Sequence, residues 1–127
     1  YVASGTLLHL EGLPQNELQI WYKAATCFAF PSFAEGFGLP PIEAMQCGCP
    51  VLVSDIPAHR YSAGDGALFC NPYNEDDIAA KLDQLTDPER KNENAVLVER
   101  GYRNAERFTV VNVLPQWEEF FTSHVRP

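Results

Sequence analysis

The chain has 127 residues, of which 46% are hydrophobic, 12% aromatic and 20% charged. This length fits one domain, and this composition excludes disordered, collagen-like and coiled-coil chains. Seventeen acidic against nine basic residues give a net charge of −8. We therefore expect no nucleic-acid partner, because nucleic-acid binders present a basic face. The chain starts at Tyr1 rather than Met, so we expect a piece of a longer protein.

The first expected elements alternate between strand and helix. We predict a short strand at Leu7–Leu10, an amphipathic helix at Asn16–Ala25 and an apolar strand at Cys27–Phe30. Apolar residues of the helix recur at spacings of three and four, which is typical of one buried face. A wholly apolar strand indicates a parallel sheet that is covered on both faces.

The middle of the chain continues this alternation. We predict a helix at Leu39–Cys47, a strand at Val51–Val53, a loop at Ser54–Gly66 and a strand at Ala67–Cys70. Strands that alternate with helices predict βαβ units, and hence an α/β fold with a Rossmann-like parallel sheet flanked by helices. Ligands of such folds bind at the carboxyl ends of the strands.

Helices account for the rest of the chain. Asn74 is a good N-cap for one helix, and Asp87-Pro88 begins another that runs to about Arg107. A last helix carries Trp117, and Pro115 either begins or kinks it. No apolar run approaches the roughly 18 residues of a membrane span, and we expect a cytoplasmic protein.

The segment between the second predicted strand and its following helix has the chemistry of a binding loop. Gly36 and Gly38 lack Cβ atoms, so the backbone can turn sharply and approach a ligand closely. The N–H groups of Gly38 and Leu39 are unpaired at the helix N-terminus, where the helix dipole favours a phosphate or hydroxyl oxygen. Pro40 and Pro41 remove two competing donors.

Two acids flank this loop, Glu35 within it and Glu43 about one turn into the helix. A carboxylate that accepts from two vicinal hydroxyls is a common way to hold a ribose, so Glu43 is a candidate nucleotide ligand. Glu35 lies where a sugar on the terminal phosphate is expected. From spacing alone, the alternative is equally good: Glu43 is a solvated helix acid and Gly36-Phe37-Gly38 only a tight turn, matching neither the dinucleotide fingerprint nor a P-loop.

The four cysteines give no metal pattern. Cys47 and Cys49 form C-G-C, which lacks the two-residue gap of zinc hairpins, and no His pair follows at ligand spacing. We expect four reduced, mostly buried thiols, and neither a metal nor a cofactor.

The residues from Glu35 to Asp55 read E-G-F-G-L-P-P-I-E-A-M-Q-C-G-C-P-V-L-V-S-D. This run resembles the donor-site signature, E-x7-E, of the family 4 retaining glycosyltransferases (group 1, GT-B fold). The resemblance covers almost the whole chain, from Leu10-Glu11-Gly12 through Gly64-Asp65-Gly66-Ala67 to Gly101. It implies that residues 1–127 are a partial C-terminal donor-binding domain, and that the acceptor domain lies upstream.

The resemblance also assigns roles to the loop residues. It implies that Glu43 holds the ribose of a nucleoside-diphosphate sugar and that Glu35, the expected catalytic residue, lies against the transferred sugar. Backbone amides of Phe37, Gly38 and Leu39, in the turn opened by Gly36, contact sugar hydroxyls and diphosphate. The resemblance further implies a reaction that is metal-independent at the diphosphate and retains the anomeric configuration.

The resemblance also implies groups that this chain lacks. An Arg/Lys pair neutralises the diphosphate in the family, and we find no counterpart before Leu7. Arg60 is the only base near the ligand end, and we interpret it as a solvated loop residue. His59 lies in a predicted rim loop, and His9 and His124 lie away from the site, so we assign none of them to catalysis.

The predicted function is donor binding within a glycosyltransferase, and we expect the fragment alone to be inactive. The run from Ser54 to Arg60 is similar to mannosyltransferase members, which favours GDP-mannose over UDP-sugars. The acceptor is a glycan or a lipid-linked acceptor, and membrane association would come through the missing domain. The alternatives are another GT-B enzyme, such as a sugar-nucleotide epimerase or a phosphorylase, and a non-catalytic module that binds nucleotide-sugars.

Overall fold

The computed structural model of the chain describes residues 7–124. Its helices and strands occur in the following order: α1 (Gln15–Ala24), β1 (Phe28–Phe30), α2 (Leu39–Gln46), β2 (Val51–Ser54), α3 (Pro57–Ala63), β3 (Leu68–Cys70), α4 (Glu75–Thr86), the 3-10 turn η1 (Pro88–Arg90), α5 (Lys91–Glu106) and α6 (Val110–His124).

The three strands form one parallel sheet in the order β1-β2-β3. Phe28 pairs with Val51, and Leu52 pairs with Leu68. Parallel pairing of β1 and β2 through α2 confirms the predicted βαβ unit, and the carboxyl ends of all strands meet at one edge. The central strand β2 is completely buried, which explains why its sequence is apolar without alternation.

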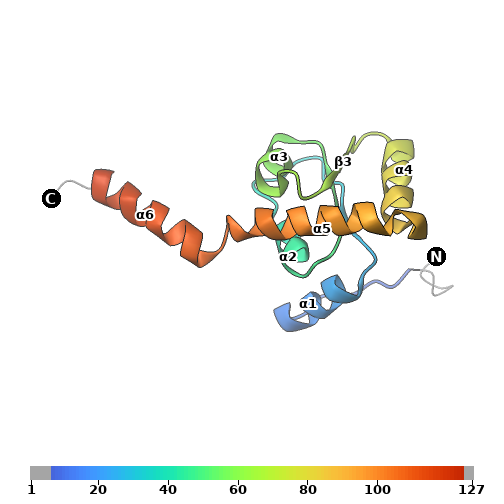
Figure 1. Cartoon of the computed structure of the whole chain (residues 1–127), viewed down its shortest axis with the longest axis horizontal. Coiled ribbons are helices and arrows are strands. Elements are labelled where there is room, and N and C mark those ends of the chain that lie inside the picture. The colour runs from blue at the N-terminus through green and yellow to red at the C-terminus, as the bar shows by residue number, and fades with distance from the viewer. Residues whose placement is uncertain (1–6, 125–127) are drawn as a thin grey trace.

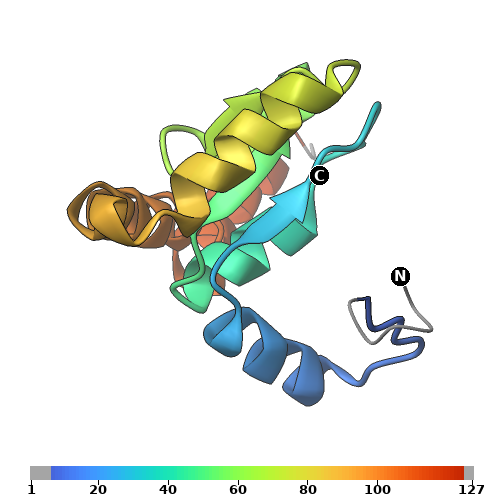
Figure 2. The ribbon, with the colours of Figure 1, turned by 90° about the vertical axis from the view of Figure 1, so that its right-hand side faces the viewer.

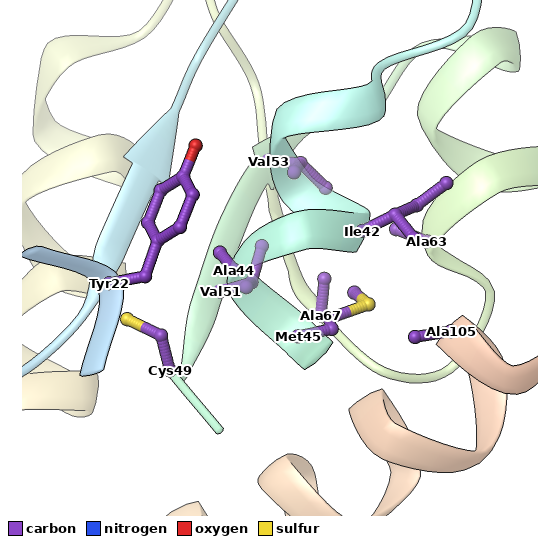
Figure 3. Close-up of a cluster of buried hydrophobic side chains, with 10 residues drawn as sticks. All are labelled: Tyr22, Ile42, Ala44, Met45, Cys49, Val51, Val53, Ala63, Ala67 and Ala105. Atoms are coloured by element: carbon purple, nitrogen blue, oxygen red, sulfur yellow. The ribbon is translucent and has the colours of Figure 1, made fainter. Parts of the chain in front are cut away.

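Helices cover both faces of the sheet. Figure 2 shows α4 across one face and α2 against the other, with α1 beyond α2. Val51 and Val53 point to the α2 side, where they pack with Ile42 and Met45 (Figure 3). Leu52 points to the α4 side and packs with Leu85. Successive residues of β2 thus anchor two separate apolar clusters, as the pleat of a strand dictates.

Helix α5 crosses the molecule, and α6 extends away from the body of the fold (Figure 1). At the crossing, Gly101 of α5 meets Gly66 in the turn before β3. A Cβ atom on Gly66 would lie 2.7 Å from the Cα atom of Gly101, so the two backbones are in direct contact. Helix α6 contains Pro115 and buries none of its side chains; Trp117 is 54% exposed.

Two predicted elements differ from the structure. Leu7–Leu10 forms no strand, and these leucines are exposed, because in the described residues no strand pairs with this segment. The predicted loop Ser54–Gly66 contains α3, which Pro57 opens at a position where proline fits a first helical turn. None of the helices in residues 7–124 is long and apolar enough to cross a bilayer.

Candidate functional site

The glycine loop, which we define as Glu35–Leu39, leaves the carboxyl end of β1 and runs into α2. Gly38 is the N-cap of α2 and has a left-handed backbone, with φ of 90° and ψ of 61°. Side chains rarely adopt this conformation, so the turn requires glycine here. Leu39 is the first helical residue, and Pro40 and Pro41 lack N–H groups. The amide of Leu39 is therefore the one donor that the first three positions of α2 offer to a ligand.

The glycine loop lies directly on α3. A Cβ atom at Gly38 would be 2.9 Å from Cδ2 of His59 and 3.4 Å from Oγ of Ser62, whereas one at Gly36 would meet nothing within 4 Å. Gly38 is thus packed and buried, while Gly36 is open to solvent. The space beside Gly38 on the α3 side is therefore filled by protein, whereas the space beside Gly36 is open.

Glu43 is half-buried and faces α1. Its Oε1 atom accepts a hydrogen bond of 3.2 Å from Nε2 of Gln15. The hollow beside it has a volume of about 220 Å³ and is lined by Gln15, Gln19, Lys23, Glu43, Gln46 and Cys47. The carboxylate also lies close to Tyr22, whose pKa rises to about 12 through burial and, secondarily, through the charge of Glu43.

Glu35 is also half-buried, but it is not among the residues that line the hollow beside Glu43. The structure shows no direct contact between the two carboxylates. Glu35 thus begins the glycine loop, whereas Glu43 lies in α2, and their shared use by one ligand stays a prediction.

A larger hollow, of about 930 Å³, opens on the other side of the glycine loop. Phe37 and Leu39 contribute to its wall together with Tyr61 of α3, the end of α5 and the start of α6. The rings of Phe37 and Phe108 meet edge to face with centroids 5.4 Å apart. An aromatic wall of this kind is typical of ligand pockets and domain interfaces.

Two cations of this larger hollow were missed by the sequence analysis. Arg103 and Arg107 are four residues apart, so they lie on one face of α5 and both line the hollow. The guanidinium of Arg107 lies 5.0 Å from the ring centroid of Phe108 and donates to Oδ1 of Asn104 at 2.8 Å. The spacing was readable in the sequence, but their position in one hollow with Phe37 and Leu39 depends on how α5 crosses α2.

Arg60 is held by a carboxylate. Its Nε and Nη2 atoms donate to the two oxygens of Asp55 at 2.5 and 2.6 Å, and the guanidinium lies 4.1 Å from the ring centroid of Phe69. The hydrogen bonds from Arg60 lower the pKa of Asp55. Arg60 is exposed, as expected, and its guanidinium is already paired with the carboxylate of Asp55.

His59 lies elsewhere than expected. It was predicted on a rim loop, but it is completely buried in α3, because the segment after β2 forms a helix that packs against the sheet. The cysteines are free thiols, of which Cys49 and Cys70 are buried, and burial raises the pKa of Cys49 to about 11. Within residues 7–124, His, Cys, Asp and Glu side chains form no group of three or more that suits a metal ion.

Comparison with known proteins places this architecture in a family. The profile of the family described as "Glycosyl transferases group 1" matches residues 3–104. The O-antigen chain mannosyltransferase B of Escherichia coli is 37% identical over 112 residues, which are 88% of this chain and 29% of that protein. The O-antigen chain mannosyltransferase RfbU of Salmonella typhimurium is 52% identical over 60 residues, which are 47% of this chain and 17% of that protein.

Solved structures share the fold. Sucrose-phosphate synthase from Thermosynechococcus elongatus superposes with a TM-score of 0.78 at 24% sequence identity, over 90% of this chain and 29% of that one. The N-terminal domain of Candida albicans trehalose-6-phosphate phosphatase gives a TM-score of 0.81 at 17% identity, over 93% of this chain and 26% of that one.

The parallel sheet flanked by helices is the GT-B type of fold that these solved structures share, and the profile match makes it a glycosyltransferase domain. The chain belongs to the group 1 glycosyltransferases. It spans about three tenths or less of the length of the two curated relatives named above.

Proposed function

We propose that this chain is the donor-binding part of a retaining, family 4 glycosyltransferase, and that its ligand is a nucleoside-diphosphate sugar. The observation that carries the proposal is the glycine loop. It leads from the carboxyl end of a parallel strand into α2, and it presents the amide of Leu39 between two acidic residues, Glu35 and Glu43. An amide at a helix N-terminus suits a phosphate or hydroxyl oxygen, and flanking carboxylates suit sugar hydroxyls.

Each acid has its own part in the proposal. Glu43 accepts from the ribose hydroxyls in the hollow beside α1, and its present partner, the amide of Gln15, is an exposed side chain that a ligand can displace. Glu35 binds the transferred sugar or stabilises positive charge that develops at its anomeric carbon. The amides of Phe37, Gly38 and Leu39 contact sugar hydroxyls and the diphosphate.

The preferred donor is GDP-mannose. Three kinds of support agree: the run from Ser54 to Arg60, the O-antigen mannosyltransferases among the relatives, and three serotype-specific mannosyltransferases from Escherichia coli that are 42% identical over 77 residues. The acceptor is a glycan or a lipid-linked acceptor. A cytoplasmic location, with membrane association through another domain, stays a prediction.

The isolated chain is proposed to bind donor without transferring sugar. The acceptor domain and the Arg/Lys pair for the diphosphate would lie upstream of residue 1, and Arg60 is already paired with Asp55. Transfer of mannose by the purified 127-residue chain would contradict this part of the proposal.

Calorimetric titration of the chain with GDP-mannose, UDP-glucose and UDP-N-acetylglucosamine tests the binding site. We expect GDP-mannose to bind most tightly, and Glu43→Gln to weaken it by about tenfold to a thousandfold, since charge-assisted hydrogen bonds contribute roughly 1.5–3 kcal/mol each. The control is Glu17→Gln, which removes an exposed acid from the first turn of α1 and should leave affinity unchanged. If no nucleotide-sugar binds, or if both substitutions act alike, the assignment of the site fails.

A further inference from the structure

His59 is a completely buried polar residue that the proposed donor site does not use. Its Nδ1 atom lies 3.1 Å from the carbonyl oxygen of Ser54 and 3.2 Å from the Ser54 hydroxyl. A carbonyl oxygen only accepts hydrogen bonds, so Nδ1 carries the proton in this arrangement. The other ring nitrogen, Nε2, then has a lone pair without a partner.

The hydrogen bonds of His59 continue to the segment that leads into the glycine loop. The hydroxyl of Ser54 donates to the carbonyl oxygen of Ser32, two residues after β1. His59 on α3, Ser54 at the end of β2 and Ser32 therefore form one connected network. This network holds the segment that leads into the glycine loop against the carboxyl edge of the sheet.

The opposite edge of the imidazole supports the end of the same loop. Atoms Cδ2 and Nε2 would lie 2.9 and 3.2 Å from a Cβ atom at Gly38, so the ring fills the space directly beneath this residue. The ring also packs beside Phe30, with centroids 5.7 Å apart. One buried side chain thus contacts Gly38 of the loop directly and is linked through Ser54 to Ser32, three residues before the loop begins.

Two buried polar atoms without a hydrogen-bond partner indicate that His59 does more than fill space. Both Nε2 of His59 and Oγ of Ser62 are buried without a hydrogen-bond partner, which is unfavourable for polar atoms. An apolar side chain would fill the same space without that cost. What only histidine supplies here is the Nδ1 donor together with a flat ring against Gly38.

We propose that His59 is a positioning residue that sets the conformation of the glycine loop for donor binding. It acts through its hydrogen bond to Ser54, and through that of Ser54 to Ser32, on the segment before the loop, and through contact with Gly38 within the loop. It is buried behind the loop and does not touch the ligand. The inference rests on the proposed function insofar as the loop binds a nucleoside-diphosphate sugar.

The test compares two substitutions in the 127-residue chain. His59→Asn keeps an N–H donor at the place of Nδ1, whereas His59→Leu fills similar space without a donor. We expect His59→Leu to weaken GDP-mannose binding at least tenfold and to shift the backbone amide resonances of Gly36, Gly38 and Leu39. His59→Asn should recover most of the affinity and most of the original resonance positions.

Val53→Ala is the matched control, because it creates a cavity in β2 but removes no hydrogen-bonding side chain of the network. We expect it to lower stability in urea but to leave donor affinity and the loop resonances unchanged. The proposal is overturned if His59→Leu binds donor as the unmodified chain does, if His59→Asn and His59→Leu lose affinity equally, or if Val53→Ala reproduces their effect.

A second measurement is independent of donor binding. Long-range proton–nitrogen spectra of the unmodified chain should show His59 protonated at Nδ1 and bare at Nε2, and the opposite tautomer would overturn the proposal. If no nucleotide-sugar binds the unmodified chain, the proposed function fails, while the tautomer and the loop resonances still decide the role of His59.

Discussion

Gly38 is the residue on which the geometry of the candidate site depends most directly. Its φ of 90° and its contact with His59 both exclude a side chain. We expect Gly38→Ala to lower the free energy of unfolding by about 1–3 kcal/mol, because the backbone is strained and the ring beneath must move. Urea denaturation measures this change.

Gly36→Ala is the control for that substitution, since a Cβ atom there meets nothing within 4 Å. Its effect should stay within about 0.5 kcal/mol. Equal losses for both substitutions would show that the two glycines act only through flexibility of the loop.

Asp55 and Arg60 make stability depend on pH in the acid range. Hydrogen bonds from Arg60 lower the pKa of Asp55 in the folded chain. The pair therefore stabilises the fold fully above the unfolded pKa, about 3.9, and loses this effect as pH falls through the lower folded value. We expect the stability difference between the unmodified chain and Asp55→Asn to be present at pH 6 and to be smaller at pH 3, below the unfolded pKa. Urea titrations at both values measure it.

The comparison for this pair is Glu99→Gln, which neutralises an exposed acid of α5. Its stability difference should not follow the same course with pH. A difference for Asp55→Asn that persists unchanged to pH 3 would contradict the assigned direction of the pKa.

At the scale of single residues, the sequence predicted what local chemistry determines. The glycine loop, the first-turn prolines and the exposure of Arg60 follow from residue type and spacing. The burial of His59 and the position of Arg103 and Arg107 in one hollow with Phe37 do not, because they depend on the packing of helices far apart in the chain. The roles of Glu35 and Glu43 stay predictions.

At the scale of elements, strong local signals gave the right helices. Asn74 was predicted as an N-cap, and its side chain accepts a hydrogen bond from the amide of Asp77 at 3.1 Å. We expect Asn74→Ala to cost about 1 kcal/mol of stability, because the first turn of α4 loses this partner. Asn92→Ala, at an exposed position in the first turn of α5, should change stability less. Thermal unfolding of both variants checks the difference.

The two errors in element prediction have one physical source. Leu7–Leu10 has the composition of a strand, but a strand also needs a neighbour, and none pairs with it in the described residues. The segment at α3 was predicted as part of the loop Ser54–Gly66, whereas buried contacts of His59 and Ala63 stabilise it as a helix. Local propensity is a weak guide where packing decides.

At the scale of the whole molecule, the alternation of apolar strands and amphipathic helices was sufficient to predict the parallel sheet. The position of α6 could not be predicted in this way. Its apolar face is exposed, with Val111 80% and Phe121 52% accessible to solvent. Nothing in the pattern of the helix itself distinguishes it from one that packs on the sheet.

This exposure gives a prediction for the whole chain. A version that ends at Thr109 should keep the same circular dichroism per helical residue and a Tm within about 5 °C, because α6 buries none of its side chains. Unfolding of the shortened chain at room temperature would show that α6 stabilises the sheet after all.

The contact between Gly66 and Gly101 has a further consequence for the position of α5. A Cβ atom added at Gly66 would collide with the backbone of α5. One added at Gly101 would lie 3.1 Å from the side chain of Met45. The substitution Gly66→Ser would therefore force α5 to move away from the turn before β3. Arg103 near the end of α5 and Arg107 directly after it would then change their position relative to Phe37 and Leu39 across the hollow. A small substitution at Gly66 would thus alter the shape of the larger hollow, although Gly66 does not line it.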